Sequence, residues 1–545
     1  MEKVLEQGNF RQSMSWLHTW GSLVAGWVLF CIFLTGAIGV FDDDITHWMN
    51  PEQKQTAVVD PASLTQSERA AMVEMGQRYL QEVMPEGHFW AIGLPSEDHP
   101  VIRLFWQDMQ ENPGAQLLDP LKGEPLPAEQ NRQTEGGHHF VHMHFELHAG
   151  QAGIWLVGFF TMIMLVALVS GIIIHRRIFK DFFTLRFSKG QRSWLDAHNV
   201  SSVITLPFQL MIAYTGLAVF VAVYMPAAMY VNYQNPEDFF SELFEEPPHQ
   251  AETGIKAEVV SLTNILLQGE QLLGRPASFV TVEHPGDSSA RARVFGLFDP
   301  DEAFGKLVSQ GSGRAMFNAT NGQLMHHRMP GQVIDNPAYS AQQIMRRLHF
   351  ANYGGYTVRW LYFLLGLAGA VMIASGSILF MVKRRQKALN EFGRHTARVY
   401  RGIEALNIAA ITGLAIACVG FLWINRLLPL EVDMRAVREI QLFFLLWFGT
   451  FLHAILRPAI SAWREQLWLF ASLCLLLPIL NWITTGDQLI SYIGNNDWRA
   501  AGVELAALLL GLLALYSVRH LRQRQARQQA DCPTRASIQA QRGIS

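Results

Sequence analysis

Apolar residues gather in eight long runs along the chain, separated by polar segments or by clusters of arginine and lysine. A transmembrane helix needs about 20 mainly apolar residues, because the hydrocarbon core of a bilayer is about 30 Å thick. The pattern therefore predicts a mainly α-helical, polytopic membrane protein with about eight transmembrane helices. The predicted spans are 16–40, 151–175, 200–224, 358–382, 403–424, 440–456, 466–484 and 501–518.

Two long polar segments interrupt the spans, and both have the pattern of a small α+β domain. Residues 61–83 show helical periodicity and precede the strand-like stretches FWAIGLP and VIRLFWQD. The second segment repeats this order, with VVSLTNILLQGEQLL before ASFVTVEH and ARARVFGLF. The predicted organisation is a first helix (11–40), a first small domain (41–147), helices two and three (148–224), a second small domain (225–348), helix four (349–385), an additional four-helix region (400–520) and a tail (521–545).

The charged residues predict how the chain is oriented in the bilayer. Basic clusters follow spans two, four and eight, and cytoplasmic loops carry an excess of lysine and arginine. Both termini are therefore expected in the cytoplasm and the two small domains on the opposite side. The basic tail is interpreted as a cytoplasmic flank, so the lipid bilayer is an expected partner and nucleic acid is not.

Cysteine usage restricts the metal chemistry open to the exported segments. Cys31, Cys418 and Cys474 fall inside predicted spans, and Cys532 lies in the tail. The exported segments therefore have no cysteine for a disulfide or a thiolate metal site. Any metal bound there must use histidine, carboxylate or methionine ligands.

The first four spans are two copies of one unit, and the copies repeat four histidines. In spans one and three, a histidine at the cytoplasmic end lies 17 residues before a Thr-Gly pair. In spans two and four, a Leu-His pair at the outer end precedes a Ser-Gly pair and a basic cluster. The inner histidines are His18 and His198, with Thr35-Gly36 and Thr215-Gly216; the outer ones are His148 and His349, with Ser170-Gly171 and Ser375-Gly376.

The outer histidine of the first copy belongs to the run HHFVHMHFELH, residues 138–148, which holds five histidines. Aligning the Leu-His pairs selects His148, although the second copy then needs about four extra residues. His144 lies one helical turn earlier on the same face and is the alternative ligand. The other three histidines of the run are expected in an exported flank outside any cofactor pocket.

Paired histidines on facing helices at two depths of a bilayer favour haem iron with two axial imidazoles. Histidine at the edge of a span is costly and usually functional, and helix bundles supply such ligands from opposing helices. The chain has no CxxCH motif, so the expected cofactors are two non-covalent haem b groups. His175, at the inner end of span two, is a further cofactor-binding candidate.

The span–segment–span units, the LHTW and DAHN histidines, the Thr-Gly pairs and the stretch SGIIIHRRIFKDFFTLR resemble the PepSY-associated transmembrane protein family, over residues 11 to about 390. The resemblance implies a bacterial inner-membrane protein with periplasmic PepSY domains and a four-helix di-haem bundle, and relatives include siderophore-iron reductases. It carries axial haem ligation to His18, His198, His148 and His349, with His175 in a matching segment. The last four spans depart from the family pattern.

The expected function is therefore reduction of a periplasmic ferric chelate, such as a siderophore–iron complex, by electrons that cross the membrane. The chain has no GxGxxG at a strand–helix junction and no Walker-type loop, which argues against an NAD or FAD site. A quinol or a separate flavoprotein is expected as donor. The alternatives are a metal or siderophore transporter and a non-catalytic PepSY membrane regulator. The transporter is disfavoured because the spans lack the buried carboxylates and the Pro/Gly-broken helices expected near a midplane binding site. The regulator leaves the paired histidines unexplained.

Overall fold

Within the described residues, eight helices are long and apolar enough to cross a membrane, in agreement with the eight predicted spans. The structure is a computed structural model that describes residues 10–52, 61–96, 99–110, 112–127, 132–175, 191–248, 250–298, 304–308, 311–332, 335–387 and 392–530. Cys532 and most of the basic cluster after span two lie outside these residues. Cys31, Cys418 and Cys474 are buried and unpaired by disulfides.

The first four spanning helices form a closed bundle. They are α1 (Phe10–Gly39), α6 (Gly150–Ile174), α8 (Gln191–Val219) and α15 (Gly355–Lys387). Helix α1 packs against α6 and α15, and α8 packs against the same two helices. Residues of the two sequence copies therefore face each other across the bundle interior.

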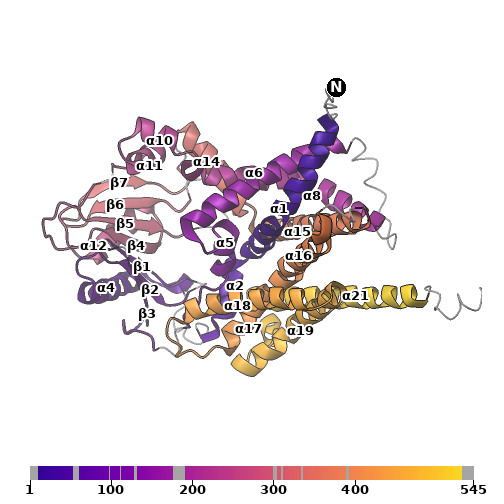
Figure 1. Ribbon diagram of the computed structural model, residues 1–545. Coiled ribbons are helices and arrows are strands. Elements are labelled where there is room, and N and C mark those ends of the chain that lie inside the picture. Colours follow the sequence, from indigo (N-terminus) through magenta and orange to yellow (C-terminus); the bar gives the residue numbers. More distant parts are fainter. Residues whose placement is uncertain are drawn as a thin grey trace, which may run out of the picture.

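The remaining spans form a second helical region that docks on this bundle (Figure 1). Helix α16 (Thr396–Ile408) continues through a π-helical turn, Ala409–Gly413, into α17 (Leu414–Leu427). It is followed by α18 (Arg435–Leu456), α19 (Ala459–Thr485), α20 (Leu489–Gly494) and α21 (Trp498–Ala530). The indole nitrogen of Trp27 on α1 donates a 2.7 Å hydrogen bond to Asn407 Oδ1, one of the contacts that join the two regions.

The two polar segments between the spans share one seven-stranded antiparallel sheet instead of forming two separate domains. The first segment contributes α4 (Gln66–Val83), β1 (Phe89–Gly93), β2 (Ile102–Gln107) and β3 (Pro113–Leu118). The second contributes α12 (Leu262–Leu273), β4 (Ala277–Glu283), β5 (Arg291–Gly296), β6 (Arg314–Asn318) and β7 (Leu324–Arg328). The helix-then-strand order of each segment is as expected, but the strand order is β3-β2-β1-β4-β5-β6-β7.

The physical reason for this single sheet is the edge strand of each copy. Strands β1 and β4 pair in antiparallel register from Phe89↔Glu283 to Gly93↔Phe279. Apart, each would expose a row of unpaired backbone groups, and joining the copies satisfies both rows. Helices α4 and α12 pack together, and a buried ion pair joins them, with Arg69 Nε 2.6 Å from Glu270 Oε1.

Short helices connect the sheet to the membrane bundle. After each odd-numbered span come α2 (Asp42–Met49) in the first copy and α9 (Val221–Tyr224), α10 (Ala227–Asn232) and α11 (Pro236–Phe244) in the second. Before each even-numbered span come α5 (His138–Phe145) and α14 (Pro337–Phe350). Pro61–Ser63 and Gly393–His395 form single 3-10 turns. Helices α5 and α14 matter most, because each carries a histidine at the outer end of the bundle.

Candidate cofactor site

The inner histidines predicted from the repeat lie next to each other. The ring centroids of His18 on α1 and His198 on α8 are 6.4 Å apart, with the ring planes at 70°. Nδ1 of His18 is 2.9 Å from the carbonyl oxygen of Ala167, and Nδ1 of His198 is 2.9 Å from that of Met372. A carbonyl oxygen only accepts hydrogen bonds, so each Nδ1 carries the proton and each Nε2 keeps its lone pair.

The outer pair consists of His144 and His349, and His148 is not part of it. The ring centroids of His144 on α5 and His349 on α14 are 5.9 Å apart, with the ring planes at 30°. His144 Nδ1 donates to the Ile32 carbonyl at 2.8 Å, and His349 Nδ1 lies 3.1 Å from Thr215 Oγ1. Burial lowers the pKa of His349 to about 3 and also lowers the pKa of His144. Both imidazoles are therefore neutral at physiological pH.

The backbone between α5 and α6 explains why the pairing based on Leu-His was wrong. His148 follows the end of α5 and, like Leu147, adopts a left-handed backbone conformation, with φ of 52° and 54°. This turn directs His148 away from the bundle interior. By contrast, His144 and His349 are both the penultimate residues of their helices. Both also lie 26 residues before the serine of their Ser-Gly pair, so the correct alignment needs no insertion.

The four paired rings rest on the four glycines of the repeated Thr-Gly and Ser-Gly pairs. A Cβ added to each glycine would approach the neighbouring ring to 3.3 Å for Gly171 and His18, 3.1 Å for Gly376 and His198, 2.5 Å for Gly36 and His144, and 2.9 Å for Gly216 and His349. Each ring also hydrogen-bonds the backbone four residues before its glycine, at Ala167, Met372, Ile32 and Ile212. The missing side chain lets each ring lie against the helix backbone, which explains why the copies repeat a glycine there.

This arrangement predicts different effects for alanine at two of the glycines. Gly216→Ala would bring a methyl group to 2.9 Å from His349 Cε1, whereas Gly171→Ala leaves 3.3 Å to His18 Cε1. We expect Gly216→Ala to displace His349 and to lower the occupancy of an outer cofactor, with a smaller effect of Gly171→Ala on the inner one. Cofactor content per chain, measured on purified protein, tests this. Equal losses in the two variants would contradict the ring-on-glycine arrangement.

The two histidine pairs lie near opposite faces of the membrane bundle. On α1, 18 residues separate His18 from Gly36, which contacts the outer pair, and the same number separates His198 from Gly216 on α8. At 1.5 Å per residue this corresponds to about 27 Å of helix. The hydrocarbon core of a bilayer is about 30 Å thick, so the pairs are placed to serve the two sides of a membrane.

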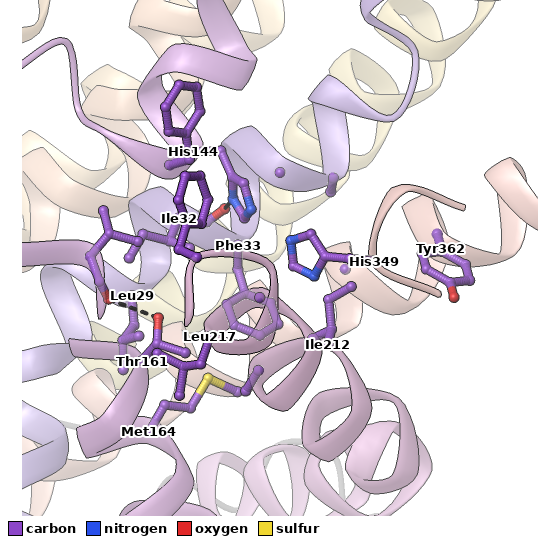
Figure 2. Close-up of a pocket in the computed structure, with 18 of the residues that line it drawn as sticks. Leu29, Ile32, Phe33, His144, Thr161, Met164, Ile212, Leu217, His349 and Tyr362 are labelled. Atoms are coloured by element: carbon purple, nitrogen blue, oxygen red, sulfur yellow. Dashed lines mark hydrogen bonds between the residues drawn. The ribbon is translucent and has the colours of Figure 1, made fainter. Parts of the chain in front are cut away.

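An apolar cavity lies between the rings of the outer pair. Figure 2 shows His144 and His349 on its wall, with Phe33, Met164 and Leu217 among the apolar side chains that line it. The cavity holds about 860 Å³ of empty space, part of it open to the surroundings.

The donor set fits an iron atom with two axial imidazoles. Two metal–nitrogen bonds of about 2 Å, plus about 1.1 Å from each nitrogen to its ring centre, would place the ring centroids about 6 Å apart. The observed separations are 6.4 Å in the inner pair and 5.9 Å in the outer pair. In the outer pair, neutral rings flanked by the apolar side chains of the cavity suit a non-covalent porphyrin.

The remaining candidate histidines have other partners. His148 Nε2 lies 2.9 Å from Nδ1 of His139, which is fully buried and stacks on Phe421 of α17. Burial lowers the pKa of His139 to about 2. His139 therefore packs against the second helical region, a contact that the sequence did not reveal. His175 accepts a 3.2 Å hydrogen bond at Nε2 from the Asn199 amide and lacks the carbonyl-bonded arrangement of the four paired rings.

A second cavity separates the first bundle from the added helices. Its membrane-facing part is lined by apolar residues such as Leu364 and Leu510, and its outer end by Asp44, His47 and Arg499. Tyr356 Oη donates to Asp44 Oδ1 at 2.8 Å, and Arg499 Nε lies 3.1 Å from the same oxygen. This crevice is amphipathic, with a polar mouth on the outer side.

The added helices contain buried carboxylates, which the sequence analysis did not expect. Glu504 on α21 is fully buried and accepts hydrogen bonds from Trp48 Nε1 and Asn481 Nδ2, at 3.3 and 2.9 Å. Glu439 on α18 is fully buried against Arg435. Both carboxylates lie in the second helical region, where Glu439 is paired with Arg435 and Glu504 accepts from Asn481.

The bundle, its histidine pairs and the seven-stranded sheet define a polytopic membrane protein of duplicated architecture. The chain belongs to the family described as the PepSY-associated TM region, whose model matches residues 15–383. It is also 26% identical over 339 residues to an uncharacterised protein of Pseudomonas aeruginosa, a match covering 58% of this chain and 79% of the relative. The family match ends before α16, so the added helices lie outside it.

Proposed function

We propose that this protein is a haem b protein of the bacterial inner membrane that passes electrons across the membrane to reduce a periplasmic ferric chelate, such as a siderophore–iron complex. The proposal rests on one observation: two histidine pairs of the same construction lie about 27 Å apart along the helices. Each pair takes one histidine from each copy of the repeat. The proposed axial ligands are His18 and His198 for the inner haem, and His144 and His349 for the outer haem. His148 is replaced by His144 in this assignment.

The chain's own residues hold and orient the cofactors. Backbone carbonyls of Ala167, Met372 and Ile32 accept the Nδ1 protons of three of the rings, which leaves Nε2 available as the ligand atom. Because the glycines next to the rings have no side chain, each ring can lie in contact with the helix backbone. Bound haem iron would supply one-electron transfer without a proton-transfer residue. Reduction weakens the hold of hard-oxygen chelators, which match Fe(III) better than Fe(II).

The proposed orientation places both termini in the cytoplasm and the sheet in the periplasm. It rests on the basic residues that follow span four, including Lys383, Arg384 and Arg385, and on those of the C-terminal helix. The sheet then lies at the outer end of the bundle, on the side of α5 and α14 (Figure 1), the helices that carry His144 and His349. A ferric chelate would approach the outer pair from this side.

The histidine geometry supports electron transfer better than transport. An ion path requires ligands spaced along one route, whereas these histidines form two closed pairs at opposite ends of the bundle. A regulator that only binds peptides through its sheet would need neither pair. Both alternatives remain outcomes of the spectroscopic test.

The decisive experiment is a visible spectrum of the purified protein reduced with dithionite. We expect sharp b-type α and Soret bands and two haem groups per chain, and we expect the bands to decay when a ferric chelate is added without oxygen. A colourless preparation from haem-replete cells would reject the proposal and favour the transporter. Haem bands that no ferric chelate can reoxidise would reject the proposed substrate class while leaving the cofactors in place.

We propose a quinol or a separate flavoprotein as the electron donor. A variant of the inner histidine pair distinguishes between these two donors. A quinol bound in the amphipathic crevice beside α1, with its polar head near Asp44 and His47, would feed the outer pair directly and bypass the inner pair, so transfer across the membrane through both pairs corresponds to a cytoplasmic donor. A flavoprotein would deliver electrons at the cytoplasmic side. His198→Ala is therefore expected to abolish reduction driven by a cytoplasmic flavoprotein, while a quinol in the crevice would still reach the outer pair. Steady-state haem reduction in membrane vesicles with each donor measures this.

A further inference from the structure

Three side chains with metal-binding atoms meet where the two copies of the sheet join. His88 comes directly before β1 and His284 directly after β4, so the antiparallel pairing of these strands places the two side by side. The backbone N–H of His284 donates to the carbonyl of His88 at 3.0 Å, and the ring centroids are 5.4 Å apart. Glu252, from the segment after α11, completes the cluster.

The ligand atoms of this cluster are close enough to share one ion. All three lie within 4.8 Å of one another, with Glu252 Oε1 3.9 Å from His88 Nδ1 and 4.0 Å from His284 Nε2. Metal–ligand bonds of about 2.0–2.2 Å would require each group to move by only a fraction of an ångström. His284 is buried, whereas His88 and Glu252 are partly exposed, so the cluster is anchored on one side and open on the other.

Hydrogen bonds around His284 present the correct nitrogen to the cluster. Ser289 Oγ donates to Asp287 Oδ1 at 2.6 Å, so its oxygen is free to accept from His284 Nδ1, 3.3 Å away. With its proton on Nδ1, His284 directs the unprotonated Nε2 toward Glu252. Such outer partners fix the tautomer and the orientation of metal-binding histidines.

The same carboxylate also fixes the segment that carries Glu252. Asp287 Oδ1 accepts from the backbone N–H and the hydroxyl of Thr253, at 3.1 and 2.9 Å. Asp287 thus ties the turn after β4 to the neighbour of Glu252. His284 itself has a left-handed backbone, with φ of 51°, a conformation uncommon for residues other than glycine. The cluster is therefore held in place by a built network.

We propose that His88, Glu252 and His284 form a binding site for a divalent transition-metal ion, of the Zn²⁺ or Fe²⁺ class. Two imidazole nitrogens and one carboxylate oxygen, with open positions for water, are a donor set that both ions take. The single carboxylate gives the site a net charge of −1 that partly neutralises the ion. Because His88 belongs to the first copy and the other two ligands to the second, the ion would cross-link the two halves of the sheet. This site is separate from the proposed haem ligands.

Metal binding by the full-length purified protein tests the proposal. The protein is first treated with a chelator, which leaves haem iron bound. It is then titrated with Zn²⁺ and Co²⁺, and the bound metal is quantified by elemental mass spectrometry. We expect one more equivalent in the wild type than in Glu252→Gln or His88→Ala, and at least about tenfold weaker binding in Ser289→Ala, whose effect is on an outer partner. Anaerobic Fe²⁺ competing with Co²⁺ decides between the ions.

The control is His327→Ala, which removes an exposed histidine of β7 outside the cluster and should leave the stoichiometry unchanged. Zn²⁺ should also raise the melting temperature of the wild type but not of Glu252→Gln. Equal metal content and equal melting shifts in the wild type and Glu252→Gln would overturn the site and favour a simple histidine–glutamate ion pair. If His284→Ala does not fold, Glu252→Gln decides alone. The haem spectrum, read on the same samples, keeps this result independent of the proposed function.

Discussion

Under the proposed function, replacing His349 by alanine is expected to halve the haem content of the chain and to reduce the proposed ferric-chelate reductase activity to background. The ring of His349 lies over Gly216, with His144 across the cavity, and the assignment leaves no second imidazole to take its place. Loss of an axial ligand should cost more than the loss of outer partners, which already lowers metal affinity by about 10- to 100-fold. Pyridine haemochrome quantitation and chelate-driven reoxidation measure the two effects.

The matched controls for this prediction are His144→Ala and His148→Ala. The first should reproduce the loss, because His144 completes the outer pair. The second should retain both haem groups, because His148 contacts His139 instead of the cavity. If His148→Ala loses a haem and His144→Ala does not, the outer pair has been assigned incorrectly.

Breaking the buried ion pair of α18 is expected to cost about 3–5 kcal/mol of stability, the usual effect of leaving a buried charge without its partner. Arg435 and Glu439 are fully buried, with Arg435 Nη1 2.5 Å from Glu439 Oε1. Glu439 also accepts from Thr134 Oγ1, and Arg435 donates to the carbonyl of Gln133. Glu439→Ala would therefore loosen the link between the second helical region and the segment leading into α5.

Thermal unfolding of the detergent-solubilised protein, followed by tryptophan fluorescence, measures this loss. The control is Arg438→Ala, which removes an exposed arginine from the same helix and is expected to change stability by less than about 0.5 kcal/mol. Similar melting temperatures for Glu439→Ala and Arg438→Ala would show that the buried pair does not stabilise this junction. A lowered melting temperature with unchanged haem content would assign the added helices a structural role at the outer end of the bundle.

Local patterns in the sequence were enough to predict the helices and the duplication. Each span has its own apolar run, and the helix-then-strand order of the exported segments follows from hydrophobic periodicity. The inner pair could also be predicted, since His18 and His198 lie at the same distance before a Thr-Gly pair. The glycines of these pairs could be identified in the sequence. That the histidine rings pack against them could not.

The outer pair shows how a local motif can mislead. The Leu-His alignment selected His148 and required about four extra residues in the second copy, whereas counting back from Ser170 and Ser375 selects His144 and His349 without any insertion. The shared sheet was missed for a related reason. Each segment predicts its own strands, but the pairing of β1 with β4 joins residues almost 200 positions apart.

The sequence by itself determined the eight membrane-spanning helices, the duplicated unit and the inner histidines, because these depend on hydrophobicity and spacing within single segments. The tertiary structure decided which histidine of the run 138–148 faces His349, because the left-handed turn at Leu147 and His148 directs one ring away and leaves His144 at the end of α5. It also decided that the two copies share one sheet and bring His88, Glu252 and His284 together. Strand edges and helix faces find their partners only when segments far apart in the chain pack against each other.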